Sequence, residues 1–283
     1  MARGDTASVE PIIGEAAAVA DLGEVQALLV ADVHAGIEAG LRYERGVELD
    51  SRADTRRDQL CALIDETAAE RLVVLGDLAH RIGQPQGEER SELATLIRAI
   101  TDRVPMTLVE GNHDSGVAAA FSETIDVIGP AGGLLAPDGT LADPSSTTGD
   151  DDSRVGCQPS VGVLHGHTWP NPALLGADIV CMGHEHPQVR LADTVGGSRV
   201  ERAWLRGSID PSSFIEEPRT DAAAVDQSTL PELVVFPAFN ERSGGTWTNV
   251  DGHSFLAPFL PDALSDGDAY LLDGTRLGAF QEV

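Results

Sequence analysis

Five short motifs in this chain combine histidine with aspartate, asparagine or glycine, the residue types that bind metal ions and move protons. In chain order they are Asp32-Val33-His34, GDLAH (76–80), GNHD (111–114), His165-Gly166-His167 and GHEH (183–186). Seven of the eight histidines lie in them. One motif alone is weak evidence, because Asp-x-His is often a surface pair and Gly-Asp a common turn. Five together, each following an apolar stretch, indicate a metal site.

The mixture of ligand types indicates two divalent cations. A carboxylate can give one oxygen to each of two ions about 3.5–4 Å apart. Imidazole, carboxylate and amide ligands suit manganese, iron or zinc better than calcium, which binds oxygen atoms. We expect manganese first, with iron, zinc and nickel as alternatives. A cysteine–zinc site is excluded because Cys61, Cys157 and Cys181 stand outside the motifs; we expect Cys61 and Cys181 to be small core residues.

Buried parallel strands would bring the first three motifs to one edge of a sheet. Apolar runs predict strands at 25–31, 71–75 and 105–109, each ending at a motif. Amphipathic stretches predict helices at 54–70 and 88–103. Alternating strands and helices are typical of parallel βαβ units, and ligands gather beyond the carboxyl ends of such strands.

The pattern changes after Phe121. Short apolar strands are expected at 161–164 and 177–182, before the last two motifs. Four antiparallel strands are expected at 188–193, 199–206, 233–236 and 269–272. Polar stretches near 130–160 and 216–231 are predicted to be surface insertions, the first partly disordered. We expect a single domain over residues 1–283.

The charge of the chain is strongly negative. Asp and Glu number 46 against 19 basic residues, a net charge of −27, and every basic residue is arginine. An acidic, lysine-free surface suits a cytoplasm of high salt, so we expect a halophilic source. The start of the chain lacks the pattern of a signal peptide and no apolar stretch could span a bilayer, so we expect a cytoplasmic protein with no membrane contact.

In their order the five motifs resemble those of the calcineurin-like metallophosphoesterase superfamily. The sequence around the motifs is similar to that of a narrower branch, the archaeal phosphoesterases related to the Mre11 and SbcD nucleases, and to that of the bacterial ligase-associated metallophosphoesterases. The features that carry this second resemblance are Arg45-Gly46, GDLAH, GHEHP and LVVFPAFNERSGG (233–245).

The resemblance implies an α/β fold of four layers (α/β/β/α), in which two mixed sheets pack face to face and helices lie outside. It also implies two groups of metal ligands: Asp32, His34 and His186 for one ion, and Asn112, His165 and His184 for the other. Asp77 would bridge the ions. His113, oriented by Asp114, would act as general acid or transition-state stabiliser during in-line attack on phosphorus, without a phosphoenzyme.

Three further residues are candidates for contact with the substrate. His80 stands where the superfamily often has an aspartate, and we place it near the site but not on a metal. His167 would either touch substrate or hydrogen-bond a ligand. Arg45 lies in the densest run of arginines, and a returning loop could let it grip a phosphate. The neighbouring Arg52, Arg56 and Arg57 are expected only to pair with Asp50, Asp54 and Asp58.

The preferred function is therefore metal-dependent hydrolysis of phosphoesters, in DNA or RNA. One alternative is a phosphodiesterase or phosphatase for nucleotides, which a deep closed pocket would favour. Another is a non-catalytic scaffold, although such proteins usually lose ligands and all seven positions are occupied here. A DNA-repair helicase could be a partner.

Overall fold

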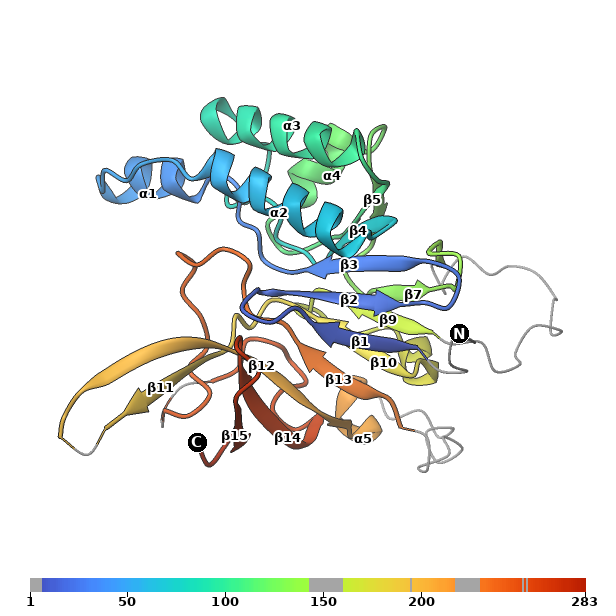
Figure 1. Cartoon of the computed structure of the whole chain (residues 1–283), viewed down its shortest axis with the longest axis vertical. Helices are drawn as coiled ribbons and strands as arrows, with labels where there is room; N and C mark the ends of the chain where they lie inside the picture. Colours follow the sequence, from blue (N-terminus) through green and yellow to red (C-terminus); the bar gives the residue numbers. More distant parts are fainter. Residues whose placement is uncertain (1–6, 143–159, 194, 217–229, 251, 253) are drawn as a thin grey trace, which may run out of the picture.

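The computed structural model describes residues 7–142, 160–193, 195–216, 230–250, 252 and 254–283. Within them two β-sheets pack face to face, and three helices cover the outer face of the first sheet while a fourth, α1, projects beyond it (Figure 1). The first sheet has the order β1-β2-β3-β4-β5-β6. Its strands are β1 (Ser8–Pro11), β2 (Ala17–Asp21), β3 (Gln26–Val30), β4 (Arg71–Val74), β5 (Met106–Val109) and β6 (Asp126–Ile128). Its helices are α1 (Ile37–Arg45), α2 (Ala53–Thr67), α3 (Gly87–Thr101) and α4 (Ser115–Phe121).

The second sheet has the order β15-β14-β12-β13-β10-β9-β7-β8, with β11 paired to β12. Its strands are β7 (Gly133–Leu135), β8 (Leu141–Ala142), β9 (Val161–Leu164), β10 (Ile179–Met182), β11 (Gln188–Ala192), β12 (Ser198–Ile209), β13 (Glu232–Val235), β14 (Leu264–Leu271) and β15 (Arg276–Ala279). Two short helices, η1 (Pro172–Gly176) and α5 (Pro211–Phe214), complete the elements of the described residues.

Both sheets are mixed, as expected for this fold. Strands β3 to β6 are parallel, while β1 and β2 add an antiparallel hairpin to β3. In the second sheet β9, β10 and β13 are parallel and the remaining pairs are antiparallel. The expectation that residues 233–236 form an antiparallel strand is therefore half correct, because β13 is parallel to β10 and antiparallel to β12.

Alternation of side chains along the strands builds three apolar layers. In β3, Leu28 faces the helices while Leu29 faces the other sheet. In β10, Cys181 lies between the sheets while Val180 faces outward. Strands buried on both faces read as continuous apolar runs, which is why the sequence located them. Each fully buried Leu or Val contributes roughly 1.5–3 kcal/mol relative to an exposed one.

The fourth layer is thinner than the first. The outer face of the second sheet is covered by η1, α5 and the segment 255–263, through Leu174, Phe214 and Phe259 among others. The helices of the first layer are longer, and α2 presents Leu60, Leu63 and Ile64 to the sheet as its amphipathic pattern predicts. Cys61 and Cys181 are buried free thiols, as expected, whereas Cys157 lies outside the described residues.

The predicted insertion at 130–160 is only partly an insertion. Strands β7 and β8 form a hairpin within it, and β7 joins the second sheet beside β9. Gly133 and Leu135 are buried there, so this part belongs to the core. Residues 143–159, and residues 217–229 of the second predicted loop, lie outside the described residues. No helix in the described part of the chain is both long and apolar enough to cross a membrane.

Candidate metal centre

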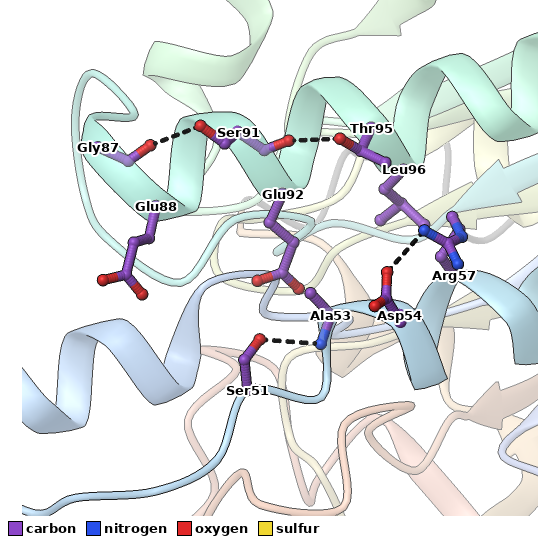
Figure 2. Close-up of a pocket in the computed structure, with 10 residues that line it drawn as sticks. All are labelled: Ser51, Ala53, Asp54, Arg57, Gly87, Glu88, Ser91, Glu92, Thr95 and Leu96. Atoms are coloured by element: carbon purple, nitrogen blue, oxygen red, sulfur yellow. Dashed lines mark hydrogen bonds and ion pairs between the residues drawn. The ribbon is translucent and has the colours of Figure 1, made fainter.

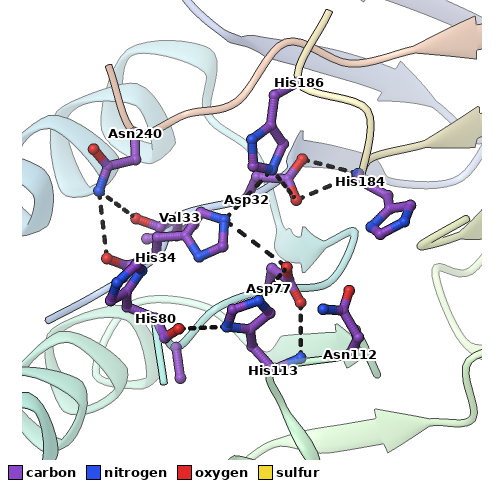
Figure 3. A network of polar contacts seen from close by, with 12 residues as sticks. Asp32, Val33, His34, Asp77, His80, Asn112, His113, His184, His186 and Asn240 are labelled. Carbon is purple, nitrogen blue, oxygen red and sulfur yellow. Dashed lines mark hydrogen bonds and ion pairs between the residues drawn. The ribbon is translucent and has the colours of Figure 1, made fainter. Parts of the chain in front are cut away.

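The five motifs meet where β3, β4, β5, β9 and β10 end (Figure 1). Three groups of side chains could each hold a metal ion: Asp32, His34 and His186; His34, Asp77 and His113; and Asp77, His165 and His184. Within each group the ligand atoms lie within 4.8 Å of one another. The first group is the set predicted for one ion. The third contains His165 and His184 of the set predicted for the other ion together with Asp77, the predicted bridge, which also belongs to the second group with His34 (Figure 3).

Asp77 turns its two carboxylate oxygens toward different groups. Its Oδ2 lies 3.8 Å from His34 Nε2, and its Oδ1 lies 3.4 Å from His165 Nε2. The backbone N–H of His113 donates to Oδ1 at 3.0 Å, which fixes the carboxylate. Asn112 joins the second group, because its Oδ1 lies 3.2 Å from His165 Nε2. A carboxylate in this position can reach two ions at once.

The backbone at these positions is strained. Seven non-glycine residues of the described chain have positive φ, and five are predicted ligands: Asp32 (56°), His34 (44°), Asp77 (52°), His184 (71°) and His186 (46°). Each such residue costs roughly 1 kcal/mol or more. Side chains that follow a strand in this left-handed conformation are turned back across the strand end, toward the shared centre. Strain concentrated in this way is typical of functional sites.

Glycines make room for the ligands. A Cβ at Gly111 would lie 2.3 Å from Asp77 Oδ1, and one at Gly76 would lie 2.2 Å from His165 Nδ1. Gly76 also has φ of 87°, which disfavours any side chain there. The glycine of GDLAH and the glycine of GNHD are therefore required by close packing around Asp77 and His165.

Backbone carbonyls orient the histidine rings. His165 Nδ1 donates to Leu75 O at 2.8 Å, and His186 Nδ1 donates to Gly244 O at 2.6 Å. Each bond leaves Nε2 as the free lone pair, and both Nε2 atoms face the centre. His186 Nε2 lies 3.0 Å from Asp32 Oδ1 and 3.4 Å from His34 Nε2. The rings are thus set to offer Nε2 to a cation.

Burial and mutual charge shift the titration of these groups in the metal-free protein. Burial alone would raise the pKa of Asp32, but His186 and the neighbouring histidines lower it to about 2. Burial, with the charges of Asp32 and Asp114, raises the pKa of Asp77 to about 8. Burial lowers the pKa of His34 and His165 to about 3, and that of His184 to about 4.

These pKa shifts bear on whether the residues can bind a cation. Neutral imidazoles are the form that binds metal, and the lowered pKa values give His34, His165 and His184 that form. Burial would lower the pKa of His186, but Asp32 raises it to about 9, so this ring releases a proton when a cation binds. A cation also relieves the repulsion between the two buried carboxylates. His34 Nδ1 is buried without a hydrogen-bond partner, so only Nε2 of that ring is engaged, and it faces the centre. The donor set, five imidazoles with two carboxylates and an amide close by, suits two divalent ions of the manganese, iron, nickel or zinc type.

The predicted catalytic pair is arranged differently from the prediction. The His113 ring is held by the carbonyl of His80, which accepts from Nδ1. Asp114, predicted to orient this ring, instead accepts from the backbone N–H groups of Gly111 (3.0 Å) and Ala79 (3.2 Å). It therefore ties the second motif to the third. The prediction that Asp114 orients the His113 ring is therefore wrong. Its carboxylate oxygens accept from backbone N–H groups instead.

The three predicted substrate residues have different positions. The His80 ring lies 5.6 Å from that of His34, and the His167 ring lies 5.3 Å from that of His165, so both border the centre. Arg45 does not. Residues 37–45 form α1 rather than a returning loop, and Arg45 is its exposed last residue, about 12 Å along the axis from Ile37. The segment forms a helix that begins directly after the turn of the first motif, where Ile37 and Glu38 are buried.

The arginines near Arg45 are paired, though not all with the expected partners. Arg57 pairs with Asp54 and Asp58, as expected, and Arg52 pairs with Glu241. Arg56 is buried and binds Glu38 of α1 with two hydrogen bonds (2.9 and 2.7 Å) and Glu92 of α3. Glu92 also accepts from the N–H of Gly36, so this network fixes the turn that carries Asp32 and His34.

Two buried residues that support the centre escape sequence reasoning. Asn240 donates to the carbonyls of Val33 and His34 at 3.0 and 3.3 Å. Glu185, between the two histidines of GHEH, accepts from Thr246, Leu256 and Ala257. Asn240 lies in the stretch 233–245 that carries the narrower resemblance, and Glu185 lies inside a motif. Their places in these two stretches could have drawn attention to them, but nothing in the residue types indicated that they support the metal ligands.

Solved structures similar to this chain include two of low identity. The crystal structure of Pseudomonas putida nuclease MPE matches with 18% identity and a TM-score of 0.49, covering 95% of this chain and 100% of that one. Yfce, a phosphoesterase from E. coli, matches with 19% identity and a TM-score of 0.33, covering 59% of this chain and 73% of that one. A search of curated proteins found no match.

A family model settles the classification. The model described as calcineurin-like phosphoesterase matches residues 26–188, which is more than half of the chain. That span begins with β3 and includes all five motifs. The chain belongs to the calcineurin-like phosphoesterase family.

Proposed function

We propose that the protein hydrolyses phosphodiester bonds in nucleic acid with two divalent metal ions, as one catalytic domain over residues 1–283. The observation that carries the proposal is the position of Asp77, whose two oxygens face the two predicted ligand groups. In this assignment Asp32, His34 and His186 hold one ion, and Asn112, His165 and His184 hold the other. The members of both groups lie together at the centre.

The chemistry divides between the ions and the protein. Two divalent cations would withdraw charge from the phosphoryl group and lower the pKa of the attacking water. His113 is half-buried at the edge of the centre, and its Nε2 lies 3.7 Å from Asp77 Oδ2. Protonated there, it can donate to a phosphoryl oxygen as charge grows, or pass the proton to the leaving oxygen. Burial lowers the pKa of His113, whereas the His80 carbonyl that accepts from Nδ1 favours the imidazolium and opposes this shift.

The choice of nucleic acid rests on the narrower resemblance and on where its residues lie. The stretch 233–245, which resembles the Mre11- and SbcD-related and ligase-associated enzymes, returns from β13 to the centre. Phe239 N–H donates to Ala31 O and Asn240 N–H to Asp32 O. Gly244 accepts from His186. A segment characteristic of that branch is thus part of the support of the metal ligands, which favours membership of the branch.

A hydrolysis panel at high salt tests this function. It compares bis-p-nitrophenyl phosphate, p-nitrophenyl phosphate, cyclic nucleotides, and single- and double-stranded DNA and RNA, each with manganese, zinc, nickel and magnesium. Asp77→Ala is the control for contaminating enzymes. We expect manganese-supported cleavage of diesters, including oligonucleotides. Cleavage of monoesters alone would make the protein a phosphatase, and no cleavage of any substrate by the metal-loaded wild type would favour the scaffold.

Four further expectations from the sequence remain part of this proposal: manganese as the physiological ion, a halophilic archaeal source, a cytoplasmic location and a DNA-repair helicase as partner. Measurement of the metals that co-purify from the native host addresses the first.

A further inference from the structure

A second pocket adjoins the metal centre. It is 540 Å³ in volume and lies between α1 and the start of α3, where its lining includes Gly40, Tyr43, Arg81 and Glu89. His80 lies between α1 and the centre, since its ring lies 5.6 Å from that of His34. A Cβ on Gly40 would lie 2.5 Å from the His80 ring, so α1 packs directly on it. His80 in turn holds His113 through its carbonyl. His80 therefore contacts both Gly40 of the pocket lining and His113 of the centre.

One guanidinium of the pocket makes no hydrogen bond or ion pair within the described residues. Its other arginine, Arg42, is occupied by Glu88, with hydrogen bonds of 3.0 and 2.9 Å. The guanidinium of Arg81 is exposed and has no hydrogen bond or ion pair within the described residues. Most arginines of the described chain are paired, in a protein of net charge −27. A free guanidinium beside a phosphoesterase centre suits a second phosphate of the substrate.

The pocket also contains an aromatic side chain without a packing role. Tyr43 is 90% exposed, whereas the other tyrosine of the chain, Tyr270, is half-buried against the sheet. Exposed aromatic faces in nucleic-acid-binding proteins serve as platforms on which bases stack. In high salt the electrostatic part of binding is screened, and stacking becomes the larger part of the affinity.

A buried acceptor completes the lining. Glu89 is 2% exposed, and its Oε1 accepts from the backbone N–H groups of His80 and Arg81 at 3.1 and 2.8 Å. Its Oε2 is buried without a partner in the described residues. Amino groups of bases and hydroxyl groups of sugars are donors that could satisfy this atom.

We propose that this pocket binds the nucleotide next to the scissile phosphodiester of a single-stranded nucleic acid, with Tyr43 stacked on its base and Arg81 on its phosphate. The inference rests on the proposed function and adds the substrate class and its second contact site. It also explains why α1 is held so firmly by Arg56 although it projects from the sheet (Figure 1).

A neighbouring pocket lacks these properties. It is 580 Å³ in volume and lies between α2 and α3 (Figure 2). Its lining includes the acidic Asp54, Glu88 and Glu92, and its arginine, Arg57, is already paired with Asp54 and Asp58. Its acidic groups are also paired, Glu88 with Arg42 and Glu92 with Arg56. None of the residues that line it is therefore an unpaired arginine that could bind a phosphate, and the strand is expected in the Tyr43 pocket.

The test measures binding and selectivity separately. Fluorescence anisotropy in EDTA gives the Kd for a labelled single-stranded DNA or RNA oligonucleotide without hydrolysis. Tyr43→Ala and Arg81→Gln are each expected to weaken binding roughly tenfold, the effect typical of losing one stacked base or one phosphate contact. Matched controls are Ile13→Ala, an exposed apolar residue elsewhere, and Arg98→Gln, an exposed arginine of α3. Both controls are expected to bind like wild type.

With metal present, the ratio of kcat/KM on the oligonucleotide to kcat/KM on bis-p-nitrophenyl phosphate is expected to fall about tenfold in both pocket variants. A Kd and a ratio within twofold of wild type in both would overturn the inference. Wild-type protein that hydrolyses the small diester but does not bind either oligonucleotide also overturns it, while leaving the metal-dependent hydrolysis intact. Loss of all hydrolysis in the wild type, by contrast, contradicts the proposed function itself.

Discussion

The backbone conformation at the centre sets the direction in which most of the predicted ligands point. Five of the seven predicted ligands adopt left-handed backbone conformations that most residues avoid. The sequence predicted which side chains would meet, because motif order and strand ends decide that. It did not predict that Asp114 would bind the backbone of Gly111 and Ala79, because hydrogen-bond partners depend on turns whose shape no residue pattern specifies.

His113 can be tested apart from the ligands. As a donor to the phosphoryl or leaving oxygen, its loss in His113→Ala is expected to lower kcat by about 10²–10⁴-fold while two metal ions remain bound. The measurement pairs kinetics on bis-p-nitrophenyl phosphate with metal content after gel filtration. His113 also lies in a possible metal-binding group with His34 and Asp77. Loss of an ion in the variant would therefore make it a ligand and remove it from the donor role.

Asn240 is expected to be important for stability. Asn240→Ala leaves the buried carbonyls of Val33 and His34 without their donor, which costs about 1–3 kcal/mol. Asn249→Ala is the control, because Asn249 makes similar bonds to Arg190 and Val283 at a more exposed position. Chemical unfolding at fixed salt compares the two. Equal and small losses of unfolding free energy in both variants would show that Asn240 does not support the centre.

Strands could be predicted from the sequence where both of their faces are buried. Strands β3, β4, β5, β9 and β10 are apolar runs and were located within one or two residues. Strand β2 was missed because its alanines (Ala17, Ala18 and Ala20) favour helix in isolation, and pairing with the neighbouring strands β1 and β3 makes them a strand. Helix α1 was missed because it is short and contains Gly40, a glycine that the His80 ring requires.

The buried ion-pair network links α1, α2 and α3 to the turn of the first motif. Arg56→Ala would leave Glu92 buried without its cation and Glu38 with Arg242 alone, at 3.5 Å, and breaking such a buried pair typically costs 3–5 kcal/mol. Arg57→Ala, one residue along α2, breaks only exposed pairs and is expected to cost under about 1 kcal/mol. Denaturant unfolding of the two variants provides the comparison. A similar loss of stability in both would show that the Arg56 network adds nothing beyond surface pairing.

At the scale of the whole molecule the excess of negative charge opposes folding. Self-repulsion of a net −27 chain is screened as salt rises, because the Debye length falls from about 10 Å at 0.1 M to about 3 Å at 1 M. We therefore expect the melting temperature to rise markedly between 0.1 M and 2 M KCl. Differential scanning calorimetry over that range is the measurement. A melting temperature that is flat or falls with salt would refute the high-salt adaptation predicted from the composition.

The central claim is a two-ion centre bridged by Asp77, and metal stoichiometry tests it most directly. Wild-type protein and Asp77→Ala are loaded with manganese, passed through gel filtration and analysed by mass spectrometry, with circular dichroism to confirm that both are folded. The wild type should retain two ions per chain, and the variant should lose both, because the one carboxylate that faces both ligand groups is gone. Two ions retained by a folded Asp77→Ala would contradict the bridging role.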